Sequence, residues 1–190
     1  MLKYFKFIEI IICLQSLVIS SMLPIFISSP FINKFKYHYE IPITWQIPTI
    51  IIFSLIFEKR IVFIALSIYL FIGLFLVPVF HQGGSLGYLL TPNFGYLVGM
   101  YPLIKIINNF SKKNKIFIYD FLKTAVLAIS YMHITGIFYS LILMIFYKQI
   151  DIFFYNFGYY TLGKIGYHIL MLIPIALLLK SLNYIKYRTE

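Results

Sequence analysis

Apolar residues fall into six runs along the chain, separated by short polar or aromatic segments. The runs are Phe5 to Ile27, Ile47 to Phe57, Ile61 to Val77, Gly95 to Phe110, Ile116 to Tyr147 and Gly163 to Leu182. A helix needs roughly 20 mostly apolar residues to cross a bilayer. The pattern therefore predicts six transmembrane helices. The second and fourth runs are short, so we expect neighbouring residues to extend them or the protein to enclose them.

Composition supports the membrane interpretation. Hydrophobic residues make up 61% of the 190 residues and charged residues 12%, with a mean hydropathy of +0.89. A soluble domain is about 45–50% apolar and about 25% charged. A water-soluble core of this size cannot hide so much apolar surface. We therefore predict an all-α integral membrane protein that forms a single transmembrane domain over residues 1–190.

Basic residues predict the orientation of the helices. A net charge of +10 would indicate nucleic acid binding in a soluble protein, but here the basic residues flank the apolar runs. Alternating six helices places Lys3, Lys6, Lys59, Arg60, Lys105, Lys112, Lys113, Lys115, Lys123, Lys180, Lys186 and Arg188 on one side. The other side holds Lys34, Lys36 and Lys148. The positive-inside rule then predicts cytoplasmic N and C termini in a multi-pass protein of the cell membrane, with no nucleic acid partner.

The first run has a second interpretation. Basic residues before an apolar stretch resemble a signal peptide, and Ser20-Ser21 imitates a cleavage site. Apolar character continues to Ile27, however, which favours a helix that is retained in the membrane.

The chain offers little catalytic chemistry. Histidines occur at positions 38, 81, 133 and 168, without an H-E-x-x-H pattern for a metal. Gly83-Gly84 is not followed by the Gly-Lys-Ser/Thr of a nucleotide-binding loop. No serine nucleophile stands beside a convincing base. We therefore expect a protein that is not an enzyme and holds no cofactor. If it transports, it runs downhill or borrows an ATPase.

The connector from Pro78 to Tyr96 is unusual because it contains no charged residue. It is rich in glycine, proline and aromatic residues, as though it folds back over a pocket. The predicted topology places it on the outer face, together with the connectors Ser28 to Gln46 and Lys148 to Leu162. Just beyond it, Gly95-x-x-x-Gly99 predicts a close approach of two helices.

Several residues near these connectors are candidates for a pocket wall. Trp45 is either an interfacial anchor or a pocket wall, with Gln46 as a neutral hydrogen-bonding group beside it. The residues that would complete the wall are Tyr69, Tyr88, Asn93 and Tyr96. Amides and phenols beside aromatic faces suit a small, flat ligand with polar tips.

Lys164 and His168 share one helix face in the last run, four residues apart. Lys164 either snorkels to the outer interface or binds the carboxylate of a ligand. His168 and His133 are either hydrogen-bonded packing residues or ligand contacts.

Two motifs resemble a known family. Ile41-Pro42-Ile43-Thr44-Trp45-Gln46 resembles the "V-P-I-T-x-Q" element of BioY, the biotin-binding S component of energy-coupling factor transporters. Pro78-Val79-Phe80-x-x-Gly83-Gly84 resembles its "P-V-F-x-x-G-G", and Gly87, Pro92, Gly95-Tyr96 and Gly99 follow the spacing "G-x-x-x-x-P-x-x-G-Y-x-x-G". The resemblance is strongest over residues 41–102. It implies an S-component-like fold that binds a vitamin under the outer loops.

The resemblance also implies partners and a binding site. A transmembrane coupling subunit and an ATPase pair would supply the energy. The expected substrate-binding residues are Trp45, Gln46, Tyr69, Phe80, Gly83, Gly84, Tyr88, Asn93, Tyr96, Lys164, Tyr167 and His168. In the last helix Lys164 stands where the family pattern "G-D-x-x-K" has its acid, and Tyr167 where it has its lysine. A different small-molecule ligand, or a non-transporting membrane scaffold, therefore remains open beside biotin import.

Overall fold

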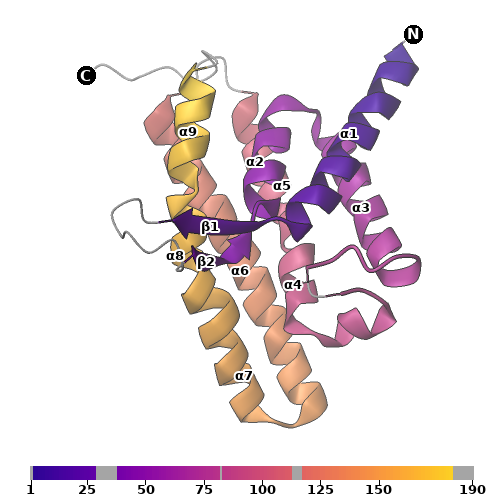
Figure 1. Ribbon diagram of the computed structural model, residues 1–190, viewed down its shortest axis with the longest axis vertical. Coiled ribbons are helices and arrows are strands. Elements are labelled where there is room, and N and C mark those ends of the chain that lie inside the picture. The colour runs from indigo at the N-terminus through magenta and orange to yellow at the C-terminus, as the bar shows by residue number, and fades with distance from the viewer. Residues whose placement is uncertain (1, 29–37, 82, 113–116, 182–190) are drawn as a thin grey trace.

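The computed structural model describes residues 2–28, 38–81, 83–112 and 117–181. Its helices and strands follow one another as shown in Figure 1. They are α1 (Leu2–Met22), β1 (Pro24–Ser28), β2 (His38–Thr44), α2 (Gln46–Ile56), α3 (Lys59–Phe75), η1 (Leu86–Leu90), α4 (Pro92–Val98), α5 (Met100–Ser111), α6 (Ile118–Tyr147), α7 (Ile150–Asn156), η2 (Phe157–Leu162), α8 (Gly163–Leu170) and α9 (Leu172–Ser181).

Within the described ranges these helices make six segments that match the six predicted ones. The segments are α1, α2, α3, α4 with α5, α6, and α7 through α9. Three stretches are long and apolar enough to cross a membrane, namely Tyr4–Met22, Ile118–Tyr147 and Ile150–Ser181. α2 has 11 residues and packs mainly against α5 and α1. A short helix is tolerated there because protein covers most of its surface.

The first helix is shorter than predicted and is followed by a strand. α1 ends at Met22, not Ile27, and the chain continues into β1, which pairs antiparallel with β2. Pro24 cannot continue the helical hydrogen-bond pattern, and the isoleucines that follow favour extended backbone. Ile25, Ile41 and Ile43 form a buried cluster against Tyr167 and Met171 of the last segment. Part of the predicted connector is thus a hairpin; Lys34 and Lys36 lie outside the described residues.

The last segment begins earlier than predicted. The supposed connector Lys148 to Leu162 is α7 followed by the π-helical turn η2, which continues directly into α8. Lys148 and Gln149 join α6 to α7, and Lys148 has a left-handed φ of 55°. The aromatic stretch beyond it contains no proline and a single glycine, so nothing in it prevents a helix. α6 and α7 therefore form a helical hairpin that projects from the lower end of the molecule (Figure 1).

Two prolines account for breaks within segments. The fourth segment begins at Pro92, three residues before the predicted start, and is interrupted at Gly99. Pro102 has no N–H for the carbonyl of Val98, so the helical pattern cannot run through unbroken. In the same way, Pro174 leaves the carbonyl of Leu170 without its donor where α8 gives way to α9.

The predicted close approach at Gly95 and Gly99 is confirmed. A Cβ atom on Gly95 would clash with the Tyr139 side chain, and one on Gly99 would lie 2.6 Å from the carbonyl oxygen of Met132. α4 therefore rests directly on α6, which brings residues from the two helices to the same pocket.

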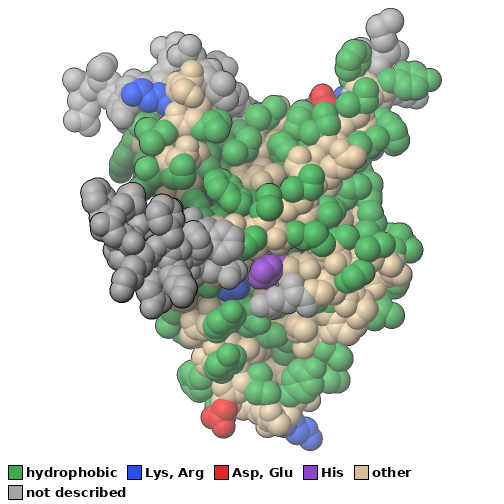
Figure 2. Space-filling model, viewed as in Figure 1, with side chains coloured by type: hydrophobic (Ala, Val, Ile, Leu, Met, Phe, Trp, Pro, Cys, Tyr) green, Lys and Arg blue, Asp and Glu red, His purple; other side chains and the backbone are tan. Residues whose placement is uncertain are grey.

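The ends of the molecule differ in charge as predicted. The start of α1, the turn between α2 and α3, the end of α5 and the end of α9 lie together at the upper end (Figure 1). Lys6, Lys59, Arg60, Lys112 and Lys180 belong to these elements. Figure 2 shows mainly hydrophobic side chains between the two ends. Lys3 is described only in its backbone, and Lys113, Lys115, Lys186 and Arg188 lie outside the described residues.

Candidate binding site

An inner cavity lies between the β-hairpin, the loop after α3, and helices α4, α6 and α8. Its volume is about 90 Å³. It is lined by Pro42, Ile43, Thr44, Gln46, Ile47, His81, Tyr88, Asn93, Tyr96, Leu97, Met100, Met132, Tyr160, Lys164 and His168. An outer cavity of about 290 Å³ shares Pro42, Ile43, His81 and Lys164 with it. The two cavities thus form one recess in which Lys164 stands at the junction.

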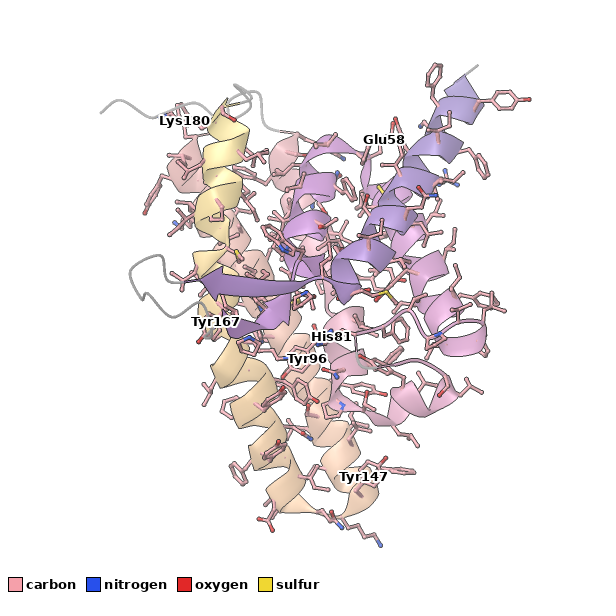
Figure 3. The ribbon with its side chains drawn as sticks, viewed as in Figure 1. Glu58, His81, Tyr96, Tyr147, Tyr167 and Lys180 are labelled. Carbon is pink, nitrogen blue, oxygen red and sulfur yellow. The ribbon has the colours of Figure 1, made fainter. Side chains whose placement is uncertain are left out.

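Side chains of this recess reach the surface. Figure 2 shows a histidine with a basic side chain beside it near the middle of a largely apolar face. Figure 3 labels His81 at this place, with Tyr96 just below it. A few polar side chains around an apolar cavity are typical of a ligand site.

The structure brings together half of the residues predicted for the site. Those that line the inner cavity are Gln46, Tyr88, Asn93, Tyr96, Lys164 and His168. Those that do not are Trp45, Tyr69, Phe80, Gly83, Gly84 and Tyr167. Each of these six residues contacts other parts of the protein.

Tyr69, Phe80 and Gly83 support the loop after α3, which forms the roof of the pocket. The ring of Phe80 lies between those of Tyr69 and Tyr88, at centroid distances of 5.2 and 4.6 Å. Phe80 and Gly83 exchange backbone hydrogen bonds of 3.0 Å across a tight turn, in which Gly83 has a φ of 126°. A stack of buried aromatic rings thus holds Tyr88 against the cavity.

The same loop is fixed to α1 and α3. Ser21 donates a hydrogen bond of 2.9 Å to the carbonyl oxygen of Val79, and the Ser85 N–H donates one of 2.9 Å to Gly73. A Cβ atom on Gly84 would lie 2.6 Å from the Cα of Pro78. This close backbone approach explains the glycine without any contact to a ligand.

Trp45 and Tyr167 lie outside the cavity. Trp45 precedes α2 and is 42% exposed, which fits the interfacial-anchor alternative. Tyr167 packs on the hairpin cluster, on the left of Figure 3. It therefore helps to hold the hairpin that covers the recess.

Gln46 is the polar group at the start of α2. Its side chain is buried, with 7% exposure, and its Nε2 has no hydrogen-bond partner among the described residues. A buried donor without a partner costs about 1–3 kcal/mol. Gln46 lines the cavity and its amide also faces the Tyr69 hydroxyl, so it is a candidate polar contact for a ligand.

Two histidines lie side by side at the inner wall. Nε2 of His133 and Nδ1 of His168 are 3.1 Å apart, and both rings are buried. The Tyr96 ring packs edge-on against His133, and its hydroxyl is hydrogen-bonded to Thr161 at 2.6 Å. His168 therefore lines the cavity, and His133, which packs against Tyr96, holds its ring in place.

Lys164 is held by aromatic rings. Its Nζ lies 5.1 Å from the ring centre of Tyr159 and 4.8 Å from that of Tyr160. Among the side chains that the structure describes, no carboxylate pairs with it. Cation–π contacts contribute less than a charge-assisted hydrogen bond to a carboxylate, so this cation is available to an anionic ligand.

Tyr88 supplies a neutral hydroxyl from the roof. Burial raises the pKa of its phenol above the ordinary value, so the group keeps its proton. The hydroxyl donates a hydrogen bond of 3.3 Å to the carbonyl oxygen of His81. Tyr88 thus adds one polar, uncharged group to a recess whose lining is otherwise largely apolar.

Sequence reasoning missed part of the lining. Tyr160 fell in the supposed connector, and Pro42 to Thr44 belong to a hairpin that the apolar runs did not predict. Met100 and Met132 line the cavity from helix faces that look like ordinary core. Treating the aromatic stretch 150–162 as a helix would have placed Tyr160 one turn before Lys164.

The helices and the roofed recess, with Lys164 as the cation among its described residues, are the architecture of a multi-pass membrane protein with a candidate small-molecule site. Comparison with known proteins gives the family. The BioY family model matches residues 7–182, so the chain belongs to the BioY family and is a multi-pass protein of the cell membrane.

Two known proteins illustrate the relationship. The chain is 41% identical over 59 residues to the "Probable biotin transporter BioY" of Lysinibacillus sphaericus. That stretch is 31% of this chain and 30% of the relative. The fold is similar to the crystal structure of the S-component for biotin from an ECF-type ABC transporter. The TM-score is 0.61 at 18% identity, over 94% of this chain and 92% of the other.

Proposed function

We propose that this chain is the substrate-binding membrane subunit of a biotin importer. The observation that carries the proposal is the position of Lys164, the cation that lines both the inner and the outer cavity. Biotin has an uncharged ureido ring system at one end and a carboxylate at the other. The inner cavity suits the rings, and Lys164 suits the carboxylate. In this role the protein binds and carries its ligand and is not an enzyme.

The polar groups of the inner cavity match the ureido head. Gln46 offers a donor without a partner to the ureido oxygen. Asn93 and the Tyr96 hydroxyl offer oxygen acceptors to the ureido N–H groups. Leu97, Met100 and Met132 supply apolar surface for the rest of the ring system. A largely apolar pocket with a few placed polar groups is typical of a small-molecule site.

The energy would come from partner proteins. Because the sequence carries no nucleotide-binding loop, we propose a transmembrane coupling subunit and an ATPase pair as partners. Copurification from membranes tests this. Recovery of an ATPase pair with a coupling subunit supports an importer, whereas a different stable partner supports a scaffold.

Direct binding tests the ligand. Purified full-length protein in detergent is titrated with biotin and with biotinamide, which lacks the carboxylate charge. We expect a Kd for biotin below micromolar, and Lys164→Ala should weaken it by roughly tenfold or more. Biotinamide should bind the wild type and Lys164→Ala almost equally. The matched control is Lys123→Ala, an exposed lysine on α6.

Two results would overturn the assignment. No affinity for biotin tighter than micromolar would exclude biotin as the ligand. Equal loss of biotinamide and biotin binding in Lys164→Ala would show that Lys164 does not face the carboxylate. A different small carboxylate is the second candidate, because Lys164 and Tyr167 replace the acid and the lysine of the family pattern.

A further inference from the structure

A further cavity, with charged residues in its lining, lies at the opposite end of the molecule from the outer loops. Its volume is about 410 Å³. It opens between the turn that joins α2 to α3 and the end of α5, and is lined by Leu55, Ile56, Phe57, Glu58, Lys59, Arg60, Asn108, Ser111 and Lys112. Figure 3 labels Glu58 at this upper end, far from His81 and Tyr96 of the biotin recess. Nothing in the proposed import function uses this cavity.

The charges around the cavity do not cancel. Both oxygens of Glu58 accept hydrogen bonds from Nζ of Lys6, at 2.9 and 3.1 Å, so this carboxylate is already paired. Among the described side chains, Lys59, Arg60 and Lys112 have no carboxylate partner. Nζ of Lys59 lies 6.0 Å from the Phe63 ring, at the limit of a cation–π contact. Three cations from two separate elements therefore meet at one recess.

Asn108 adds an acceptor to this cationic recess. Its side chain is buried, and Nδ2 donates hydrogen bonds to the carbonyl oxygens of Ser54 at 3.1 Å and Phe57 at 2.8 Å. Both partners are acceptors, so the amide cannot be turned over without losing both bonds. Oδ1 is left buried without a partner among the described residues. Because Asn108 lines the cavity, a donor group that enters beside the three cations is the candidate partner for this acceptor.

The position of this cavity at the membrane surface indicates that its ligand is a lipid. Leu55, Ile56 and Phe57 form an apolar wall directly beside the charged residues. Acyl chains suit such a wall, and basic recesses between helices at the cytoplasmic side are suited to anionic headgroups. Arg60 and the two lysines are also at the helix ends, where phosphate groups of a bilayer lie.

We propose that this cavity binds a phosphate group that carries a neighbouring hydroxyl, as in the headgroup of phosphatidylglycerol. Arg60, Lys59 and Lys112 hold the phosphate oxygens, and the hydroxyl donates to Oδ1 of Asn108. Inorganic phosphate shares this chemistry, so the experiment separates the two sources.

The probes are short-chain lipids added to the delipidated full-length protein in detergent. Dihexanoyl phosphatidylglycerol, phosphatidylmethanol and phosphatidylcholine are compared with inorganic phosphate, with stoichiometry from native mass spectrometry and Kd from ³¹P NMR titration. We expect one phosphatidylglycerol per protein. Phosphatidylmethanol, which lacks the hydroxyl, should bind roughly fivefold more weakly.

Two double variants that each remove two positive charges show whether phosphatidylglycerol binds at this cavity or is attracted by the overall positive charge of this end. Arg60→Gln/Lys112→Gln should weaken phosphatidylglycerol binding by roughly tenfold or more. Lys105→Gln/Lys123→Gln removes the same charge from exposed positions on the same side and should change it less than about twofold. Biotin affinity should stay the same in both, which separates this site from the biotin recess.

Each contrary result is decisive. Equal weakening in the two double variants, or equal binding of phosphatidylcholine, would overturn the site. Equal binding of phosphatidylmethanol would remove the role of Asn108. Inorganic phosphate that binds as tightly as the lipid would identify the free anion as the ligand and overturn the lipid as its source.

Discussion

His133 and His168 share one hydrogen bond, with 3.1 Å between Nε2 of the first and Nδ1 of the second. The bond joins α6 to α8 within the membrane. One neutral ring must donate and the other accept, so the tautomers of the two rings are coupled. Nδ1 of His133 has no partner among the described residues, so its lone pair stays unpaired when Nε2 of the same ring donates.

Replacing one histidine leaves the other unpaired. We expect His133→Phe to lower stability by about 1–3 kcal/mol, because His168 then keeps a buried polar nitrogen without a partner. His133→Phe/His168→Phe should cost less than the sum of the two single changes. Thermal unfolding in detergent measures both, with the exposed His81→Asn as the control. Additive costs would show that the contact contributes nothing.

Replacing Gln46 should raise the stability of the ligand-free protein and weaken ligand binding. Gln46→Leu removes the buried donor that has no partner, so we expect the ligand-free protein to unfold at a higher temperature. The same change should weaken biotin binding by roughly fivefold to tenfold, because the ureido oxygen loses its donor. Gln149→Leu, at the exposed turn after α6, is the control. A variant that binds as well as wild type would exclude Gln46 from the ligand contacts.

Gly136 sets the position of the Tyr96 ring. A Cβ atom there would lie 2.5 Å from that ring, so Gly136→Ala should push the ring towards the pocket. We expect a loss of about 1–3 kcal/mol in stability and weaker biotin binding. Gly166→Ala is the matched control, since its Cβ would meet nothing within 4 Å. That change should be neutral or stabilising, because alanine favours helix. Equal effects in both would show that Tyr96 moves freely.

Phe80 should matter although it does not touch the inner cavity. Phe80→Ala removes the ring between Tyr69 and Tyr88 and should cost about 3–5 kcal/mol of stability. Biotin binding should weaken as well, because Tyr88 loses its support. Phe75→Ala, with 57% exposure, is the control. Unchanged affinity in a folded Phe80→Ala protein would show that the roof is held by its backbone alone.

The sequence predicted the helical segments because apolar runs report directly on burial in lipid. It also led to the roof, since a loop that faces water normally carries charged residues and this aromatic loop carries none. It could not separate Gln46 from Trp45, because neighbouring residues at a helix start point in different directions that only the fold sets. The rings of Tyr69 and Phe80 were assigned to the wall for the same reason. Aromatic residues beside a pocket and behind it look alike in a sequence.

The π-helical turn Phe157–Leu162 lets the last segment absorb a change in chain length. A π turn holds one residue more than the same length of α-helix. Loss of a single residue there would let the turn close as α-helix and leave α7 and α8 near their present relative rotation, whereas the same loss in a regular helix rotates the residues that follow by about 100°. Tyr160 and Thr161 lie in this turn, so such a deletion would change the residues beside Tyr96 while Lys164 and His168 kept their places. Deletions at this turn are thus a route by which one membrane scaffold could change its cargo without moving its cation.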